Sequence, residues 1–182
     1  MASRKIWTDM TSIGITGHQR LSSAAVWPWV EGQIRATLAL LPEPIVGLTS
    51  LAIGADQLFA EAVLSIGGRI EAVLPFDGYT ETFSGPDLAN FNRLLALSSR
   101  TEVLDRAGSD EESYFTAGKR VVELSDLMIA VWDGAPAKGL GGTADIVHYA
   151  IALGRRVVHI NPAKRVIENL VPAQSHQRSQ NG

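Results

Sequence analysis

A glycine-rich segment at residues 139–145, Gly-Leu-Gly-Gly-Thr-Ala-Asp, carries the clearest chemical pattern in the chain. It follows the apolar run 127–132 and precedes the amphipathic run 146–153, which predicts a strand, a tight turn and a helix. Free backbone N–H groups at the positive end of a helix bind anions, most often phosphate. A flexible loop is the alternative, but a threonine at the capping position favours phosphate binding. The predicted phosphate-binding residues are Gly139, Gly141, Gly142 and Thr143.

A second polar turn, Thr-Gly-His-Gln-Arg at residues 16–20, ends the first predicted strand. The guanidinium of Arg20 could bind a phosphate through two N–H groups, and His18 could donate to a phosphate or a sugar. Gly17 would let a ligand approach the backbone closely. The alternative is a solvated turn in which Gly17 only provides the required dihedral angles. The position of the turn at a strand end favours ligand binding.

Three carboxylates stand beside these turns. Asp56, after Gly54 and Ala55, and Asp145 fall in the first turns of predicted helices, whereas Asp133 ends a strand. An aspartate at a helix start is commonly only a cap, but at a ligand site it could equally bind ribose hydroxyls. Acids beside a phosphate could also act as nucleophile or general base on an N-glycosidic bond. Sugar binding without any chemistry remains open as well.

Several other kinds of site are excluded by their missing patterns. The first turn lacks Gly-x-Gly-x-x-Gly, and no acid ends the second strand, which argues against a nicotinamide or flavin dinucleotide. Gly-Lys-Arg at 118–120 lies inside a predicted helix, so it is not an ATPase phosphate loop. His148 and His159 have no partner at metal-ligand spacing. We therefore expect no metal site and no cofactor.

Composition narrows the class of protein. The chain has 182 residues, 46% hydrophobic and 19% charged, with a net charge of −3 and no cysteine. It shows no long apolar run and no secretion signal, so we expect a cytoplasmic protein without membrane contact. Its basic residues are scattered rather than clustered, which argues against nucleic acid as the main ligand. We expect a homodimer or a higher homo-oligomer.

Strand and helix patterns alternate along the chain. The predicted strands are 12–16, 45–53, 69–74, 101–104, 127–132 and 156–160, and the predicted helices are 27–41, 55–66, 87–98, 111–124 and 142–153. The stretch 75–86 is predicted to be irregular. This order predicts an α/β, Rossmann-like fold, a mostly parallel sheet of about six strands with helices on both faces. We expect an irregular N-terminus (1–11), one domain (12–171) and a disordered polar tail (172–182).

This fold would bring the three motifs together. Right-handed crossovers place the carboxyl ends of parallel strands on one edge of the sheet, where ligands of open α/β sheets bind. If the first strand is central, its turn lies beside the glycine-rich turn, and the turn at Gly54 lies on the other flank.

The motifs resemble those of the SLOG superfamily, which unites Smf/DprA DNA-processing proteins, Lonely Guy phosphoribohydrolases and YpsA-like proteins. The resemblance covers roughly residues 12 to 162, and the long stretch 75–86 is most similar to the YpsA-like branch. It implies a Rossmann-like fold that binds a nucleotide or nucleotide derivative along the rim. The matching segments are 13–18, 50–56, 73–76, 125–126 and 139–145.

The chain departs from the Lonely Guy motif Pro-Gly-Gly-x-Gly-Thr-x-x-Glu. With Thr143 on the motif's threonine, Leu140 replaces a glycine and Ile146 stands where the glutamate belongs. Asp145 comes one position early, and the upstream arginine of that group falls near Ala117. These departures argue against hydrolase activity but leave the phosphate-binding turn in place.

The leading hypothesis is therefore a protein that binds or senses a nucleotide-type ligand. The alternative is an enzyme, a hydrolase or transferase, that acts on an N-glycosidic bond with Asp56, Asp133 or Asp145. A DNA-processing accessory protein of the Smf/DprA kind is a third hypothesis.

Overall fold

The computed structural model describes residues 10–137 and 139–171 and shows a seven-stranded sheet in the order β4-β3-β2-β1-β5-β6-β7. The strands are β1 (Thr11–Gly17), β2 (Ile45–Thr49), β3 (Arg69–Leu74), β4 (Arg100–Val103), β5 (Leu127–Val131), β6 (Arg156–Asn161) and β7 (Val166–Leu170). The helices are α1 (Trp27–Ala39), α2 (Ala55–Ser65), α3 (Gly85–Leu97), α4 (Asp110–Leu124) and α5 (Thr143–Ala152), with short 3-10 turns η1 (Ala24–Val26) and η2 (Tyr79–Thr82). All neighbouring strands pair in parallel except β6 and β7. The predicted Rossmann-like α/β fold is confirmed.

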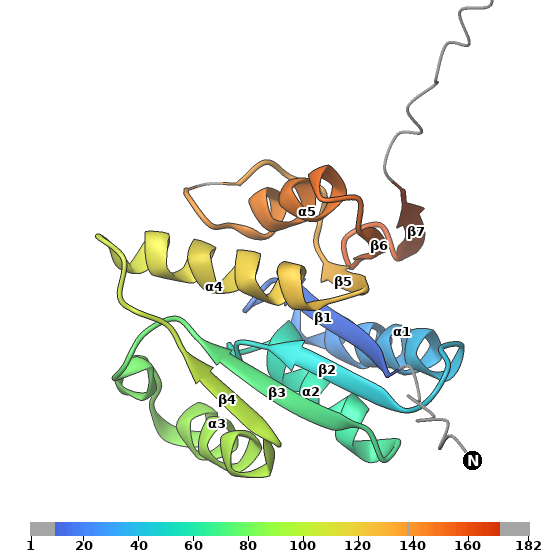
Figure 1. The fold of residues 1–182 in the computed structure, drawn as a ribbon. Coiled ribbons are helices and arrows are strands. Elements are labelled where there is room, and N and C mark those ends of the chain that lie inside the picture. Colours follow the sequence, from blue (N-terminus) through green and yellow to red (C-terminus); the bar gives the residue numbers. More distant parts are fainter. Residues whose placement is uncertain (1–9, 138, 172–182) are drawn as a thin grey trace, which may run out of the picture.

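The helices cover both faces of the sheet (Figure 1). On β5, Ile129 and Val131 join the core formed with α1, α2 and α3, whereas Met128 and Ala130 join the core formed with α4 and α5. Successive side chains of a strand point to opposite faces, so a strand covered on both sides must be apolar throughout. This explains the unbroken apolar run of β5, in which every residue is buried.

The centre of the sheet lies at β1, as the sequence suggests. The chain passes from β1 outward through β2 and β3 to β4, and then crosses to the other side of β1 to form β5. The order of strands reverses at this point, and ligands of open α/β sheets bind in the crevice that such a reversal leaves outside the carboxyl ends. The turns that follow β1 and β5 therefore lie at the expected place.

The sheet has one strand more than the six segments predicted as strands, and the ends of some predicted elements were wrong. A seventh strand, β7, pairs antiparallel with β6, whereas the prediction ended with a strand at 156–160. The strand β2 ends at Thr49 rather than at residue 53, and η2 lies inside the stretch 75–86. The strand β1 begins at Thr11, inside the segment 1–11 that is predicted to be irregular. The predicted tail, 172–182, lies outside the described residues.

No helix in the described part of the chain is long and apolar enough to cross a membrane.

Candidate functional site

The predicted site residues gather at the carboxyl edge of the sheet, but they divide between two cavities. The larger cavity has a volume of about 380 Å³ and the smaller one about 150 Å³. Of the predicted residues, the larger cavity is lined by His18, Arg20, Asp133 and Gly142. The smaller cavity is lined by Gly17, Asp56, Gly141 and Thr143.

The glycine-rich turn leads into α5, as predicted. Gly141 has a φ of +82°, and a Cβ there would lie 3.0 Å from the backbone oxygen of Glu111, so the position favours glycine for two reasons. Its N–H donates to Oδ2 of Asp145 at 3.0 Å. The N–H groups of Gly142, Thr143 and Ala144 have no acceptor among the described residues. Three consecutive free donors thus stand at the positive end of α5.

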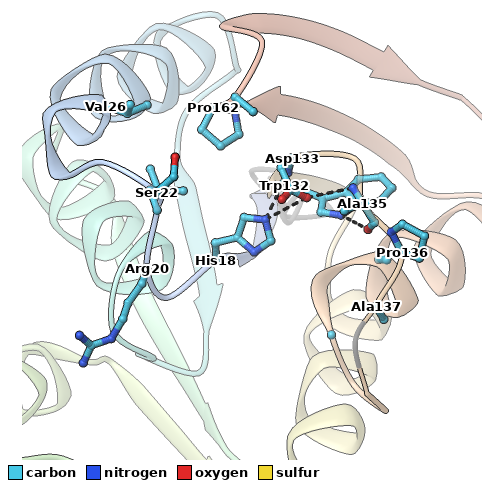
Figure 2. Close-up of a pocket in the computed structure, with 14 residues that line it drawn as sticks. His18, Arg20, Ser22, Val26, Trp132, Asp133, Ala135, Pro136, Ala137 and Pro162 are labelled. Atoms are coloured by element: carbon cyan, nitrogen blue, oxygen red, sulfur yellow. Dashed lines mark hydrogen bonds and ion pairs between the residues drawn. The ribbon is translucent and has the colours of Figure 1, made fainter.

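His18 and Asp133 connect the ends of the two central strands in the larger cavity (Figure 2). The imidazole Nε2 of His18 accepts a hydrogen bond from the backbone N–H of Asp133 at 3.2 Å and lies 3.3 Å from the carboxylate Oδ1. The same Oδ1 accepts from the N–H of Ala135 at 2.9 Å. That bond is the largest cause that holds the pKa of Asp133 below its ordinary value, and His18 adds to it.

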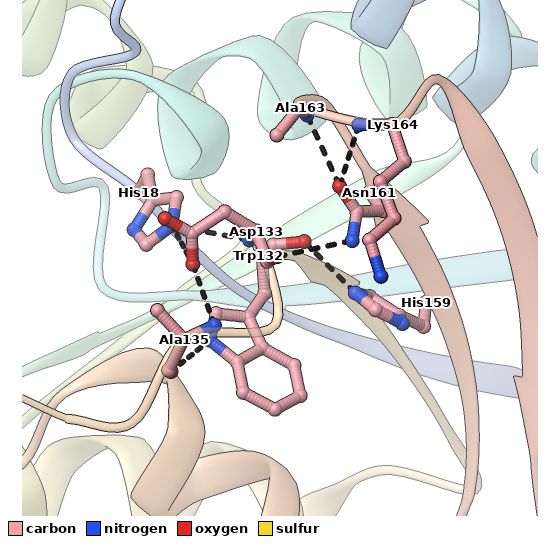
Figure 3. A network of polar contacts seen from close by, with 8 residues as sticks. All are labelled: His18, Trp132, Asp133, Ala135, His159, Asn161, Ala163 and Lys164. Atoms are coloured by element: carbon pink, nitrogen blue, oxygen red, sulfur yellow. Dashed lines mark hydrogen bonds and ion pairs between the residues drawn. The ribbon is translucent and has the colours of Figure 1, made fainter.

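Side chains of β6 form hydrogen bonds with the backbone of the loop after β5 (Figure 3). The imidazole Nε2 of His159 lies 2.8 Å from the carbonyl oxygen of Trp132, and Nδ2 of Asn161 donates to the carbonyl of Asp133 at 3.1 Å. Both side chains are buried. Asn161 also accepts from the N–H groups of Ala163 and Lys164 through Oδ1. Asp133 is therefore held in place by its backbone, which leaves its partly exposed carboxylate facing the larger cavity.

Asp56 lies in the smaller cavity and is 7% exposed. Its Oδ2 accepts from the hydroxyl of Thr49 at 2.9 Å and from the N–H of Ser50 at 3.0 Å. These bonds end β2 early and hold the loop that follows it. Burial raises the pKa of Asp56 from 3.8 to about 6, because the charged form loses solvent. Burial, and then the nearby Asp56, raise the pKa of Tyr79.

Other predicted residues lie near the cavities without lining them. A Cβ at Gly54 would overlap the backbone of His18, and the N–H of Ala55 donates to the His18 carbonyl at 3.2 Å. Gly54 and Ala55 thus support the turn after β1. Gly139 is exposed near Glu111. In Figure 2 the guanidinium of Arg20 extends away from His18.

Sequence reasoning missed several lining residues, among them aromatic residues and prolines. Tyr79 lies in η2, within a stretch that carries no periodic pattern, and Tyr114 lies on α4. Trp132 follows a strand and was taken as part of it, and Pro162 lies in the turn before β7. An aromatic residue directly after a strand was the available signal for Trp132.

The residues at or near the positions of the Lonely Guy glutamate and arginine make other contacts in this structure. Ile146 is 3% exposed and packs closely on Gly118, where a Cβ would overlap it. Of the two cations in this part of α4, Arg120 is hydrogen-bonded to Glu102, and Nζ of Lys119 lies 4.7 Å from the ring centre of Phe115. Neither cation lines the smaller cavity.

No family model and no curated protein matches the chain. Among solved structures, it is similar to the DNA processing protein A (DprA) of Streptococcus pneumoniae, with a TM-score of 0.58 and 21% identity. The match covers 82% of this chain but 50% of that protein. It is also similar to DprA of Helicobacter pylori, whose structure is described in terms of single-stranded DNA binding (TM-score 0.57, 16% identity, 82% and 64% covered). A third likeness is to the structural genomics target TM1055 (TM-score 0.53, 15% identity, 81% and 72% covered).

The chain shares the DprA fold. At these identities the likeness is one of fold alone, and membership in the SLOG superfamily stays a prediction. Membership in the YpsA-like branch stays a prediction.

Proposed function

We propose that this protein binds or senses a nucleotide or a nucleotide-derived small molecule, with a phosphate on the glycine-rich turn. The observation that supports this most is the row of three N–H groups at Gly142, Thr143 and Ala144, which have no acceptor in the described part of the chain. They stand beside two cavities at the point where the strand order reverses. A phosphate oxygen would complete hydrogen bonds that the fold leaves open.

The surrounding side chains suit the rest of a nucleotide. The carboxylates of Asp133 and Asp56, one in each cavity, are acceptors for ribose hydroxyls. Tyr79, Tyr114 and Trp132 provide apolar faces for a base.

Replacing Thr143 with proline tests this directly. Thr143 is the first residue of α5, where proline is well tolerated, and Gly142 before it has φ −66° and ψ 165°, which proline accepts in its predecessor. Thr143→Pro therefore removes one N–H while the helix start is kept. Because a hydrogen bond to a charged group contributes about 1.5–3 kcal/mol, we expect the affinity for ADP to fall by roughly 10- to 100-fold in calorimetric titrations.

Thr143→Ala is the matched control, because it keeps the backbone N–H and loses only the hydroxyl and methyl groups of the side chain. Equal affinity of the proline variant and the parent, with α5 intact by circular dichroism, would place the phosphate elsewhere.

Hydrolysis of an N-glycosidic bond is the second candidate, and the site geometry disfavours it. Asp145 already accepts from the turn, Ile146 is a core residue and no cation of α4 lines the smaller cavity. We expect no release of adenine from AMP when the protein and AMP are incubated and analysed by chromatography. Turnover that Asp145→Asn abolishes in a folded protein would make it an enzyme.

Single-stranded DNA is a third candidate, raised by the description of the Helicobacter pylori protein and opposed by the scattered basic residues of this chain. Binding to DNA phosphates weakens steeply with salt. We expect a labelled oligothymidine to show weak anisotropy changes that disappear between about 50 and 200 mM salt. Tight binding that persists at the higher salt would favour the DNA-processing role.

A further inference from the structure

Two turns separate the larger cavity from the smaller one. In the turn after β1, Gly17 and Gln19 line the smaller cavity, whereas His18 and Arg20 line the larger one. Alternate residues of this segment therefore line different cavities.

The glycine-rich turn divides in the same way. Gly141 and Thr143 line the smaller cavity, and Gly142 and Ala144 line the larger one. We call residues 17–20 and 141–144 together the partition. The three N–H groups without an acceptor among the described residues belong to this partition, so an anion bound there adjoins both cavities at once.

The two cavities compare differently with the usual size of a small-molecule pocket. Small-molecule pockets usually measure about 300–1,000 Å³. The smaller cavity, at about 150 Å³, is below this range, and the larger cavity, at about 380 Å³, is near its lower end. A molecule whose phosphate lies on the partition could use both.

Aromatic and carboxylate residues line both cavities. The smaller cavity has Asp56, Tyr79 and Tyr114, and the larger has Asp133 and Trp132. A nucleoside needs an apolar surface for its base and acceptors for its sugar hydroxyls. The same combination therefore occurs on both sides of the partition.

From this duplication we infer that the ligand has two arms, one nucleoside or sugar in each cavity, joined through a pyrophosphate or phosphodiester on the partition. This inference rests on the proposed function and narrows it to dinucleotide-type molecules. The two arms make different contacts, so each side of the site can be tested separately.

The test is calorimetric titration of the full chain with ADP and with diadenosine diphosphate, which carry the same pyrophosphate but one and two nucleosides. Tyr114→Ala removes an aromatic contact from the smaller cavity, and Tyr114→Phe, which keeps the ring, is its control. Ala163→Trp fills the larger cavity from an exposed position and retains the backbone N–H that Asn161 accepts.

We expect diadenosine diphosphate to bind the parent at least about tenfold tighter than ADP, which corresponds to about 1.4 kcal/mol. Both Tyr114→Ala and Ala163→Trp should weaken it, whereas only one of them should weaken ADP. Equal affinities for the two probes, with diadenosine diphosphate sensitive to one variant alone, would overturn the two-armed ligand while the proposed function holds. If neither probe binds the parent, the proposed function fails and this inference with it.

Discussion

Two aspartates at the rim differ in what surrounds them. Asp133 is partly exposed, and the Ala135 N–H and His18 keep its pKa low, so it is ionised and available to a ligand. Asp56 is buried, and its pKa of about 6 puts its titration within the range of ordinary buffers. The same residue type is thus open to solvent in one cavity, and buried with a raised pKa in the other.

Asp56 gives a prediction for stability. Its pKa is about 6 in the folded protein and 3.8 as a reference value, so the folded state holds the proton more tightly. The stability that this proton contributes is complete below pH 4 and is lost as the pH rises through 6. The free energy of unfolding of the parent, relative to Asp56→Asn, should therefore fall by on the order of 3 kcal/mol between pH 4 and 7.

Urea unfolding of both proteins at the two pH values measures this change. The other titrating groups are the same in the parent and in Asp56→Asn, so their contribution cancels in the difference between the two free energies of unfolding. A difference that stays constant with pH would mean that Asp56 titrates normally.

At the scale of the elements, the glycine-rich turn depends on one backbone conformation. Gly141 is left-handed, with φ +82°, and a side chain there would press on the backbone of Glu111. Gly141→Ala should lower the free energy of unfolding by at least about 1–2 kcal/mol, because left-handed backbone is unfavourable for alanine.

Gly139→Ala is the control two residues away. A Cβ at residue 139 would make only ordinary contacts, at 3.7 Å from Glu111, and the φ of Gly139 is not in the left-handed region. The free energy of unfolding of this variant should therefore stay within about 0.5 kcal/mol of that of the parent. Equal unfolding midpoints for the two variants in urea would show that the turn does not need this conformation.

The elements also show what the sequence can and cannot predict. Alternating strand and helix patterns sufficed for the fold class and for the common edge of the turns, because each pattern is local. The strand β7 was missed because it is almost entirely exposed, and because the left-handed residue in the turn before it is Arg165 (φ 54°) rather than glycine. Early termination of β2 depends on the side chain of Asp56, which a pattern of apolar residues does not record.

The sequence also could not predict that the site is divided into two cavities. His18 and Gly17 are neighbours in the chain, yet they line different cavities, because this segment lies between the two cavities. Only the packing of this turn against Gly54 and the loop after β5 determines which residue faces which side.

At the scale of the whole molecule, the reversal of strand order brings the two turns and both cavities to one edge. β1 and β5 are adjacent, so the turn after each strand reaches the same crevice, and α5 begins there with N–H groups that have no acceptor in the described part of the chain. The first turn of α5 also packs on α4, because Ile146 lies directly against Gly118. A ligand that binds only the folded state would then stabilise the entire domain, by about 2.7 kcal/mol at 100 times its dissociation constant.

The most direct measurement is amide-resolved NMR of the ¹⁵N-labelled chain titrated with ADP. We predict that the largest shift changes occur at the N–H groups of Gly142, Thr143 and Ala144, because these donors would form new hydrogen bonds to phosphate. Changes confined to other parts of the sheet, or none at these three residues at saturation, would contradict phosphate binding on the glycine-rich turn.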